Sequence, residues 1–512
     1  MRHGRQEVLL TLAVVSLLLL APARVLGQAN GTLDLSSLLR ARDPMTVISG
    51  LKDGDMEEEV KERWAKLVVQ DSQTAAKRNR DKLYPNPSLQ AYVNRLGQSL
   101  IPKEATDNAL FSFKIVEDPL PYADALATGT VYLSTGMISL LDNESQLAFL
   151  LAHETGHIML AHHVQQVIEE QKAENRAGKI KLAATAAGAL GGFLGLGGAK
   201  AGGVGGVAGL VSKVEPAKAA LLGGYLARKG ADRGLEMVDA FQSHRFIKEI
   251  QIESDQFATQ ILLDHGFDSR EAPVLMAKAS NIVHRSGATA ELAFGDAGDL
   301  PQRSAKVKEL LGGPYQPLVA RILDGKGFRM SSPRYSQLMS ELKRDNGLLA
   351  LDSDLFVIAR ANLEEAASMR TDDPLTMYGL GVLYRTVARS DEDAARAAGY
   401  LKSAMEFDDI RHRFPEAYLQ YAVELLSRED PQRYPEIQKA LKNYVALYQR
   451  NSGGGLPREM PFVYDYLDLT GDRSWIVYRV SNVRSEAPYQ LTGDTKVDGT
   501  VPPAEKRPPK KQ

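Results

Sequence analysis

Two histidines and a glutamate lie close together in the run His153-Glu154-Thr155-Gly156-His157. On a helix, a step of four residues turns by about 40°, so both imidazoles face the same side. Imidazole is a ligand for Zn²⁺, and the adjacent Glu154 would lie near enough to activate a metal-bound water. The motif therefore predicts a hydrolytic zinc site, with His153 and His157 as metal ligands and Glu154 as the catalytic base. The alternative is a pair of histidines on a solvated helix face, which a chain with only nine histidines makes less favoured.

A zinc hydrolase needs a third protein ligand, and no residue close to the motif supplies one at the expected spacing. His162 and His163 come five and six residues after His157. On a continuous helix they point about 140° and 240° away from it, either behind the ligands or at the surface. A better source is the run 248–260, whose acids stand among apolar residues. The alternative for that run is an ordinary amphipathic helix with solvated acids.

The elements that must position the motif follow from the hydrophobic pattern. The segments 111–116 and 130–134 predict two strands, and the proline-rich 119–121 predicts a turn between them. The polar run 142–145 offers an N-cap for the helix that carries the motif, and 85–88 offers one for an earlier helix. We therefore expect the HExxH helix to follow a small sheet.

The composition excludes several classes of protein. The 512 residues include no cysteine, which excludes disulfides, thiolate zinc sites, a cysteine nucleophile and a lipid-anchored cysteine. The formal net charge of −2 argues against a general nucleic-acid-binding protein. At the N-terminus, two arginines precede the apolar run 8–20, and small residues follow it. This pattern predicts a signal peptide over 1–28, cleaved on export to the periplasm or the exterior, with an uncleaved anchor as the alternative.

Three further segments have distinctive compositions. The segment 182–212 is rich in glycine and alanine, and glycine at that density disfavours a membrane-spanning helix. A loop or a surface hairpin with peripheral membrane contact is therefore favoured over a span. Residues 355–450 are predicted to be helical, with two degenerate copies of a tetratricopeptide-like pattern, and plain helical hairpins are the alternative. The end of the chain, 485–512, has the composition of a disordered tail.

These motifs together resemble a known family, the zinc metalloproteases that include the CAAX prenyl protease, HtpX and the periplasmic BepA-type protease. The resemblance covers roughly residues 85–310. The glycine-rich interruption and the helical C-terminus also resemble the periplasmic branch. The residues that carry the resemblance are 125–127, 131–137, 143–148, the HExxH motif with His162 after it, and Glu253-Ser254-Asp255 running on to 266–268.

The resemblance implies a role for individual residues. His153 and His157 match the family's zinc ligands, and Glu154 matches its general base. Asp255 matches the family's acid on a second helix, which orients a ligand or donates a proton. The strand at 131–134 matches the edge with which an extended substrate would pair. The implied cofactor is Zn²⁺, and the implied partners are unfolded or misassembled proteins of the cell envelope as substrates.

This chain departs from the family pattern at two places. The family's third ligand is a glutamate four residues before that aspartate, where this chain has Gln251. Glutamine offers only a neutral carbonyl oxygen, so the site would lose one negative charge. Glu253 is the fallback ligand, although it stands about 200° round the helix from Gln251. The family's periplasmic members also often carry a His-Pro pair, where this chain has Leu300-Pro301.

We therefore expect a mostly helical α+β protein whose HExxH metalloprotease domain contains a small sheet and precedes a helical, tetratricopeptide-like domain. The expected function is an exported zinc metalloendopeptidase. The alternative, which Gln251 favours, is a catalytically impaired protease-like scaffold or chaperone that binds envelope proteins through its helical C-terminus. The expected divisions are a signal peptide (1–28), an N-terminal helical extension (30–84), the protease domain (85–345), the helical domain (350–480) and the tail (485–512).

Overall fold

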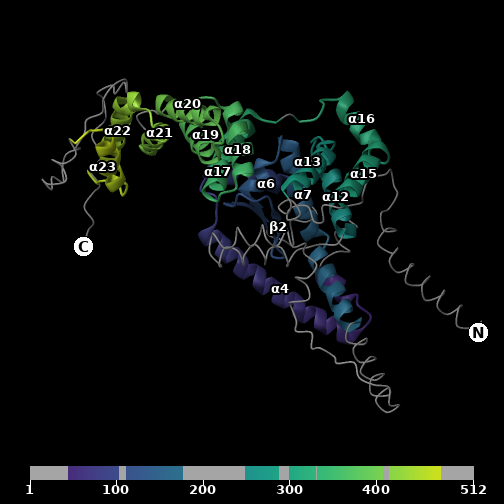
Figure 1. The fold of residues 1–512 in the computed structure, drawn as a ribbon. Coiled ribbons are helices and arrows are strands. Elements are labelled where there is room, and N and C mark those ends of the chain that lie inside the picture. Colours follow the sequence, from purple (N-terminus) through teal and green to yellow (C-terminus); the bar gives the residue numbers. More distant parts are fainter. Residues whose placement is uncertain are drawn as a thin grey trace, which may run out of the picture. The chain divides into compact units, whose positions relative to one another are not determined.

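The described residues form two compact units, which divide between Leu338 and Met339 inside helix α17 (Pro333–Asp352) (Figure 1). Helices dominate both units, and a small sheet lies in the first, as expected for a mostly helical α+β protein. The signal peptide, the glycine-rich segment and the tail predicted from the sequence lie outside these residues. No helix in the described part is both long and apolar enough to cross a membrane. The computed structural model describes residues 44–102, 111–176, 248–286, 299–329, 331–407 and 414–473.

The sheet has three strands, β1 (Ser112–Val116), β2 (Ala123–Ala125) and β3 (Thr130–Ser134), in the order β1-β3-β2. β3 pairs in parallel with β1 and antiparallel with β2, so it is the central strand. The prediction that 131–134 forms an edge strand is therefore wrong. The reason is β2, which follows the proline-rich turn and covers the side of β3 that was expected to be open.

The HExxH motif lies on α7 (Glu144–Met159), and nearly all of this helix is buried. The side chain of Asn143 accepts a hydrogen bond from the backbone N–H of Gln146 at 3.0 Å, which confirms the predicted N-cap. The helices that surround the motif helix come from both sides of it in the sequence and pack on it, on each other or on the sheet. They are α5 (Pro87–Ser99), α6 (Thr135–Ser139), α12 (Lys248–Asp264), α13 (Glu271–Ser286), α15 (Leu300–Gly312) and α16 (Gln316–Asp324).

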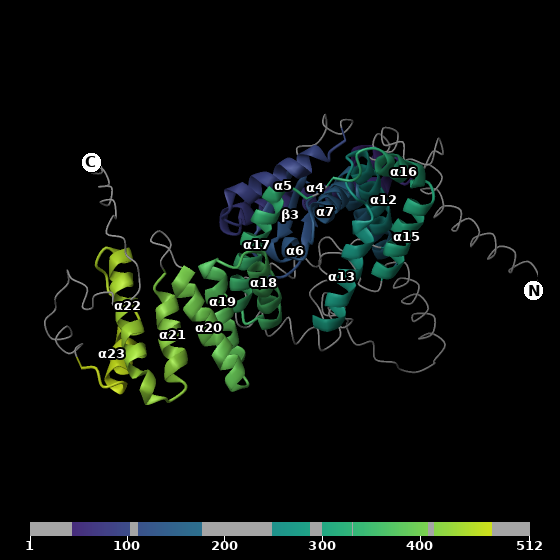
Figure 2. The same ribbon diagram turned by 90° about the horizontal axis from the view of Figure 1, so that it is seen from above.

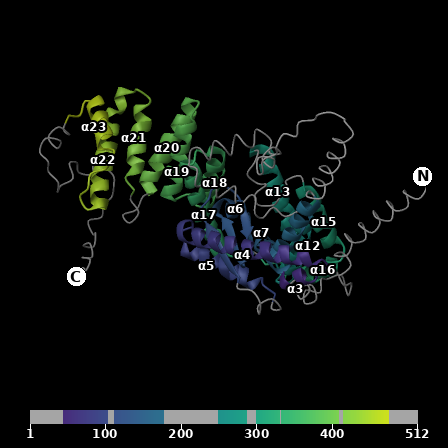
Figure 3. The same ribbon diagram turned by 90° about the horizontal axis from the view of Figure 1, so that it is seen from below.

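Two N-terminal helices, α3 (Pro44–Ser49) and α4 (Gly54–Asp81), belong to the first unit, and α4 lies beside α5 in Figure 3. Arg78 of α4 pairs with the buried Asp124 of β2. Asp71 of the same helix accepts a hydrogen bond from the backbone N–H of Ala127 at 2.6 Å. The long helix thus fixes β2 through both a charged pair and a backbone contact.

The second unit is a row of helices in which each packs on the next (Figure 2). Separate apolar clusters hold the row together, one around Leu363 and Leu380 and another around Leu441 and Leu447. The helical region expected after the protease domain is therefore confirmed, while its tetratricopeptide-like character stays a prediction. Its elements are α18 (Phe356–Met369), α19 (Pro374–Val387), α20 (Asp391–Phe407), α21 (Glu416–Leu426), η4 (Pro431–Arg433), α22 (Tyr434–Ser452) and α23 (Met460–Leu469).

Gly156, within the motif, lets α7 approach α12 closely. A Cβ at this position would lie 2.6 Å from Ser254 Oγ and 3.0 Å from Phe257 Cδ1. The Ser254 hydroxyl donates a hydrogen bond to the backbone carbonyl of His153 across the same contact. The motif glycine therefore sets the spacing between the two helices that carry the candidate site residues.

We predict that Gly156→Ala destabilises the protein by about 1–3 kcal/mol, because the added methyl group overpacks the contact with α12. The matched control is Gly399→Ala in α20, where an added Cβ meets nothing within 4 Å. That change should stabilise the helix by up to about 1 kcal/mol. Urea unfolding measures both variants, and a Gly156→Ala protein as stable as the Gly399→Ala protein would contradict the prediction.

Candidate active site

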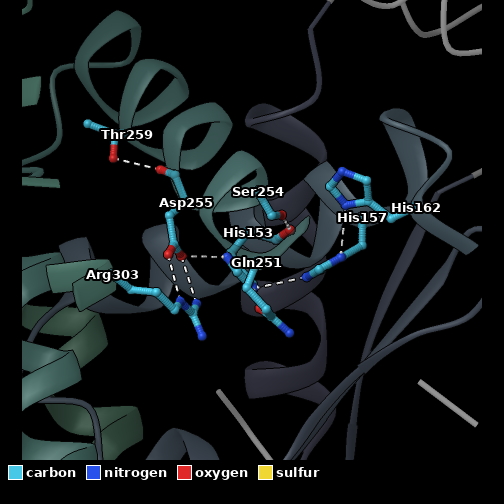
Figure 4. A network of polar contacts seen from close by, with 8 residues as sticks. All are labelled: His153, His157, His162, Gln251, Ser254, Asp255, Thr259 and Arg303. Atoms are coloured by element: carbon cyan, nitrogen blue, oxygen red, sulfur yellow. Dashed lines mark hydrogen bonds and ion pairs between the residues drawn. The ribbon is translucent and has the colours of Figure 1, made fainter. Parts of the chain in front are cut away.

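The side chains of His153, His157 and Gln251 meet in the interior of the first unit (Figure 4). His153 Nε2 lies 3.1 Å from His157 Nε2 and 3.0 Å from Gln251 Oε1. The two histidines come from α7, one turn apart, and the glutamine comes from α12. Their exposed fractions are 2%, 1% and 7%. The structure thus brings the two predicted ligands together with the residue at the predicted third position.

The spacing of these three atoms fits a bound zinc ion. Two ligand atoms of a tetrahedral zinc site lie about 3.3 Å apart, given metal–ligand distances of about 2.0–2.2 Å. His153 Nδ1 lies 2.9 Å from the Asp255 carboxylate, so the ring proton belongs on Nδ1 and a lone pair remains on Nε2. That lone pair faces those of the Gln251 oxygen. Two buried acceptors at this distance repel each other unless a cation lies between them.

The third donor is an amide in place of an acid. Among the described residues, no three histidine, aspartate or glutamate side chains gather as a metal site. Two imidazoles and one amide oxygen are all neutral donors, whereas a carboxylate at Gln251 would contribute a negative charge. The donor set therefore fits Zn²⁺ in geometry and offers it less charge than a His–His–Glu set.

Burial keeps both motif imidazoles neutral. It lowers the pKa of His153, although the Asp255 carboxylate pulls in the opposite direction. It also lowers the pKa of His157 well below its usual value, and the neighbouring imidazoles of His153 and His162 add to this effect. Neutral imidazole is the form that binds a metal ion, so no proton needs to be displaced from these rings near pH 7.

Asp255 lies between His153 and Arg303, and both charged side chains are almost fully buried. Arg303 Nε donates to Asp255 Oδ2 at 2.7 Å, and Arg303 Nη2 donates to Oδ1 at 2.8 Å. Burial alone would raise the pKa of Asp255, but the charge and the hydrogen bonds of Arg303 outweigh it and hold the pKa below its usual range. Asp255 therefore stays a carboxylate and orients the His153 ring.

Arg303 was missed as a site residue by sequence reasoning. The sequence pointed to this region only through Leu300-Pro301, which stands where relatives carry a His-Pro pair. An arginine on an amphipathic helix is usually at the surface, so its residue type gave no signal. The available signal was the buried aspartate itself, because a buried carboxylate needs a partner of opposite charge.

The helix that carries the motif ends sooner than expected. α7 stops at Met159, Ala161 takes a left-handed conformation with φ 55°, and a new helix covers 162–176. The rotation predicted for His162 and His163 on a continuous helix is therefore wrong, and so is a surface position, because both side chains are buried. His162 Nδ1 lies 3.0 Å from His157 Nδ1, and His163 Nε2 contacts the Ala125 carbonyl oxygen at 2.6 Å.

The two remaining acids have different surroundings. Glu154 follows His153 on α7 and is buried, and its role as the catalytic base stays a prediction. Glu253, the fallback ligand, lies with its carboxylate 3.4 Å from His162 Nε2, and about a quarter of its side chain is exposed (24%). The structure thus directs Glu253 toward His162, while Gln251 is the α12 side chain that contacts Nε2 of His153.

A buried HExxH helix that meets a polar donor from a second helix is the arrangement of a zinc metallopeptidase. Comparison with protein families agrees, because residues 87–220 match the model of Peptidase family M48. The chain therefore carries a peptidase domain of the M48 family, and the resemblance inferred from its motifs is confirmed.

Several individual proteins are similar to this chain. The "Beta-barrel assembly-enhancing protease" of Escherichia coli (strain K12) is 27% identical over 197 residues, which is 38% of this chain and 34% of that protein. The protein of the same name from Yersinia pestis is 29% identical over 198 residues, with the same coverage of each chain. The "Mitochondrial metalloendopeptidase OMA1" of Schizosaccharomyces pombe is 29% identical over 76 residues, 15% of this chain and 23% of that protein. The chain thus spans about a third of the length of the first two relatives.

We predict that Arg303→Met destabilises the protein by about 3–5 kcal/mol, because it leaves the Asp255 charge buried without its partner. Arg270→Met is the matched control, since Arg270 pairs with Asp268 at the surface. Loss of that exposed pair should cost at most about 1 kcal/mol. Chemical unfolding measures both variants, and equal losses of stability would contradict the role given to the buried pair.

We predict that Gln251→Glu tightens zinc binding at least about tenfold, or about 1.4 kcal/mol, because it adds a charged oxygen ligand. Gln251→Ala should weaken binding, because it removes a donor. The control is Gln256→Glu, which adds the same charge to another face of α12. Competition with a chelator measures all three affinities. If Gln251→Glu and Gln256→Glu bind zinc equally well, residue 251 does not contact the metal.

Proposed function

We propose that this protein is an exported zinc metalloendopeptidase that cleaves unfolded or misassembled proteins of the cell envelope. The observation that carries the proposal is the convergence of the His153, His157 and Gln251 side chains, with Glu154 buried on the same helix as the two histidines. Export is supported by the sequence pattern of the first 28 residues. The substrate class is supported by the two relatives named beta-barrel assembly-enhancing proteases.

The residues divide the chemistry between them. His153, His157 and the Gln251 oxygen would hold the zinc ion, which supplies a Lewis acid and lowers the pKa of bound water to about 7. Glu154 accepts the proton of the attacking water and returns it to the leaving amine, as a carboxylate next to the metal does in HExxH peptidases. Asp255 holds the His153 ring in the tautomer that presents Nε2 to the metal.

Substrate pairing by strand addition would fall to β2, because β3 is paired on both sides and side chains of α5 occupy the outer edge of β1. Asn94 Oδ1 accepts a hydrogen bond from the backbone N–H of Phe113, and Gln90 Oε1 accepts one from that of Ile115. The outer edge of β2 is partly occupied, since the Ala125 carbonyl oxygen contacts His163. The Asp71 carboxylate covers the backbone N–H of Ala127, two residues after the strand. An extended substrate would therefore add beside Ala123, at the start of the strand.

We predict that Glu154→Gln lowers cleavage of an unfolded protein at least about 100-fold and leaves the zinc content unchanged, because it removes the base and no ligand. Glu170→Gln, on an exposed stretch of the helix 162–176, is the control and should keep wild-type activity. The assay uses the purified full chain loaded with zinc, with the products followed by mass spectrometry. Cleavage that survives Glu154→Gln would overturn this mechanism.

The second candidate is a catalytically impaired scaffold or chaperone that binds envelope proteins through its helical C-terminal unit. Gln251 favours it, because a neutral third donor weakens zinc binding relative to glutamate. Metal analysis of the purified protein separates the two functions. One zinc ion per chain that resists a chelator supports the peptidase, and a metal-free protein that binds unfolded chains supports the scaffold.

A further inference from the structure

Two acids of α12 lie behind the two histidines of the motif. Asp255 lies 2.9 Å from His153 Nδ1, in direct contact with that ring. Glu253 reaches the other ring through an intermediate, because its carboxylate lies 3.4 Å from His162 Nε2 and His162 Nδ1 lies 3.0 Å from His157 Nδ1. Each motif imidazole thus has a carboxylate on the side away from the meeting point of the donors.

The break after α7 makes the second of these connections. On a continuous helix, His162 would point about 140° away from His157. The left-handed conformation of Ala161, with φ 55°, ends the helix and returns His162 to the side of His157. The two rings are then 5.0 Å apart between centroids, with planes at 69°, as an edge-on contact between the nitrogens requires. A left-handed alanine is unfavourable, so the surrounding packing must hold it in place.

The Glu253 carboxylate, at the end of this series of contacts, determines which ring nitrogens of His162 and His157 carry a proton. A carboxylate only accepts, so the proton of the His162 ring belongs on Nε2, facing Glu253. His162 Nδ1 is then an acceptor, and the hydrogen bond between the two Nδ1 atoms requires His157 to donate. His157 therefore carries its proton on Nδ1 and presents a lone pair from Nε2, beside that of His153 Nε2.

We propose that Glu253 is a positioning residue that acts through His162 to fix the ring orientation and the tautomer of His157 for metal binding. The inference rests on the proposed zinc site and gives Glu253 a role other than that of a ligand. Partners of this kind behind metal-binding histidines commonly change metal affinity by about 10- to 100-fold. For His157 the partner is not a single acceptor but a pair of groups, the His162 imidazole and the Glu253 carboxylate.

A double-mutant cycle on the full chain tests the proposal, with zinc affinity measured by chelator competition. Glu253→Ala should weaken zinc binding about 10- to 100-fold. In a His162→Gln background, the same change should have almost no further effect, because the connection is already broken. The control is Glu249→Ala, which removes the same charge from an exposed position one turn earlier on α12 and should leave the affinity within twofold. Unchanged affinity in Glu253→Ala, or an equal loss in both backgrounds, would overturn the proposal, and the equal loss would identify Glu253 as a direct ligand.

A second measurement needs neither zinc nor a His162 variant, which matters because His162 is fully buried. Nitrogen-15 NMR of the zinc-free, histidine-labelled protein reports the tautomer of each ring. The wild type should show His157 protonated on Nδ1, and Glu253→Ala should shift it toward the Nε2 form. The same tautomer in both proteins would overturn the proposal even if the protein cleaves substrate. The expected shift in a protein without peptidase activity would instead leave the proposal standing and reject the proposed function.

Discussion

The buried contact of Asp255 with His153 and Arg303 is the interaction on which the candidate site depends. It joins three helices, because His153 lies on α7, Asp255 on α12 and Arg303 on α15. A buried carboxylate is tolerated only when its charge is neutralised and its oxygens are hydrogen-bonded, and Arg303 does both. The same contact fixes which nitrogen of His153 carries the proton. The packing of the three helices and the chemistry of the site therefore both depend on the Asp255–Arg303 pair.

The charge of the site follows from this arrangement. Arg303 neutralises Asp255, and the three donors that meet at His153, His157 and Gln251 carry no charge of their own. A divalent ion held by these three donors would therefore have no anionic ligand among them. Such a site would hold zinc less tightly than one with a carboxylate as the third ligand, and would leave the ion a stronger Lewis acid. The partners that orient the two imidazoles would then account for a larger part of the zinc affinity.

Local patterns in the sequence were enough to predict the motif helix, an N-cap for it within 142–145, two strands and the helical C-terminal region. Periodicity and capping act within a few residues, so one sequence contains them. The errors came from features that depend on tertiary structure or on a single backbone angle. The left-handed Ala161 redirects His162 and His163, and the short strand β2 makes β3 central. The partner of Asp255 was also missed, because Arg303 lies 48 residues away and only folding brings it near.

The proposed function requires His153, His157 and Gln251 to hold one zinc ion together. Anomalous diffraction at the zinc edge from crystals of the full chain tests it most directly. We expect a single peak in the first unit, about 2.0–2.2 Å from His153 Nε2, His157 Nε2 and Gln251 Oε1. No peak between the two histidines of a zinc-soaked crystal, or a peak bound by Glu253 with Gln251 turned away, would contradict the claim.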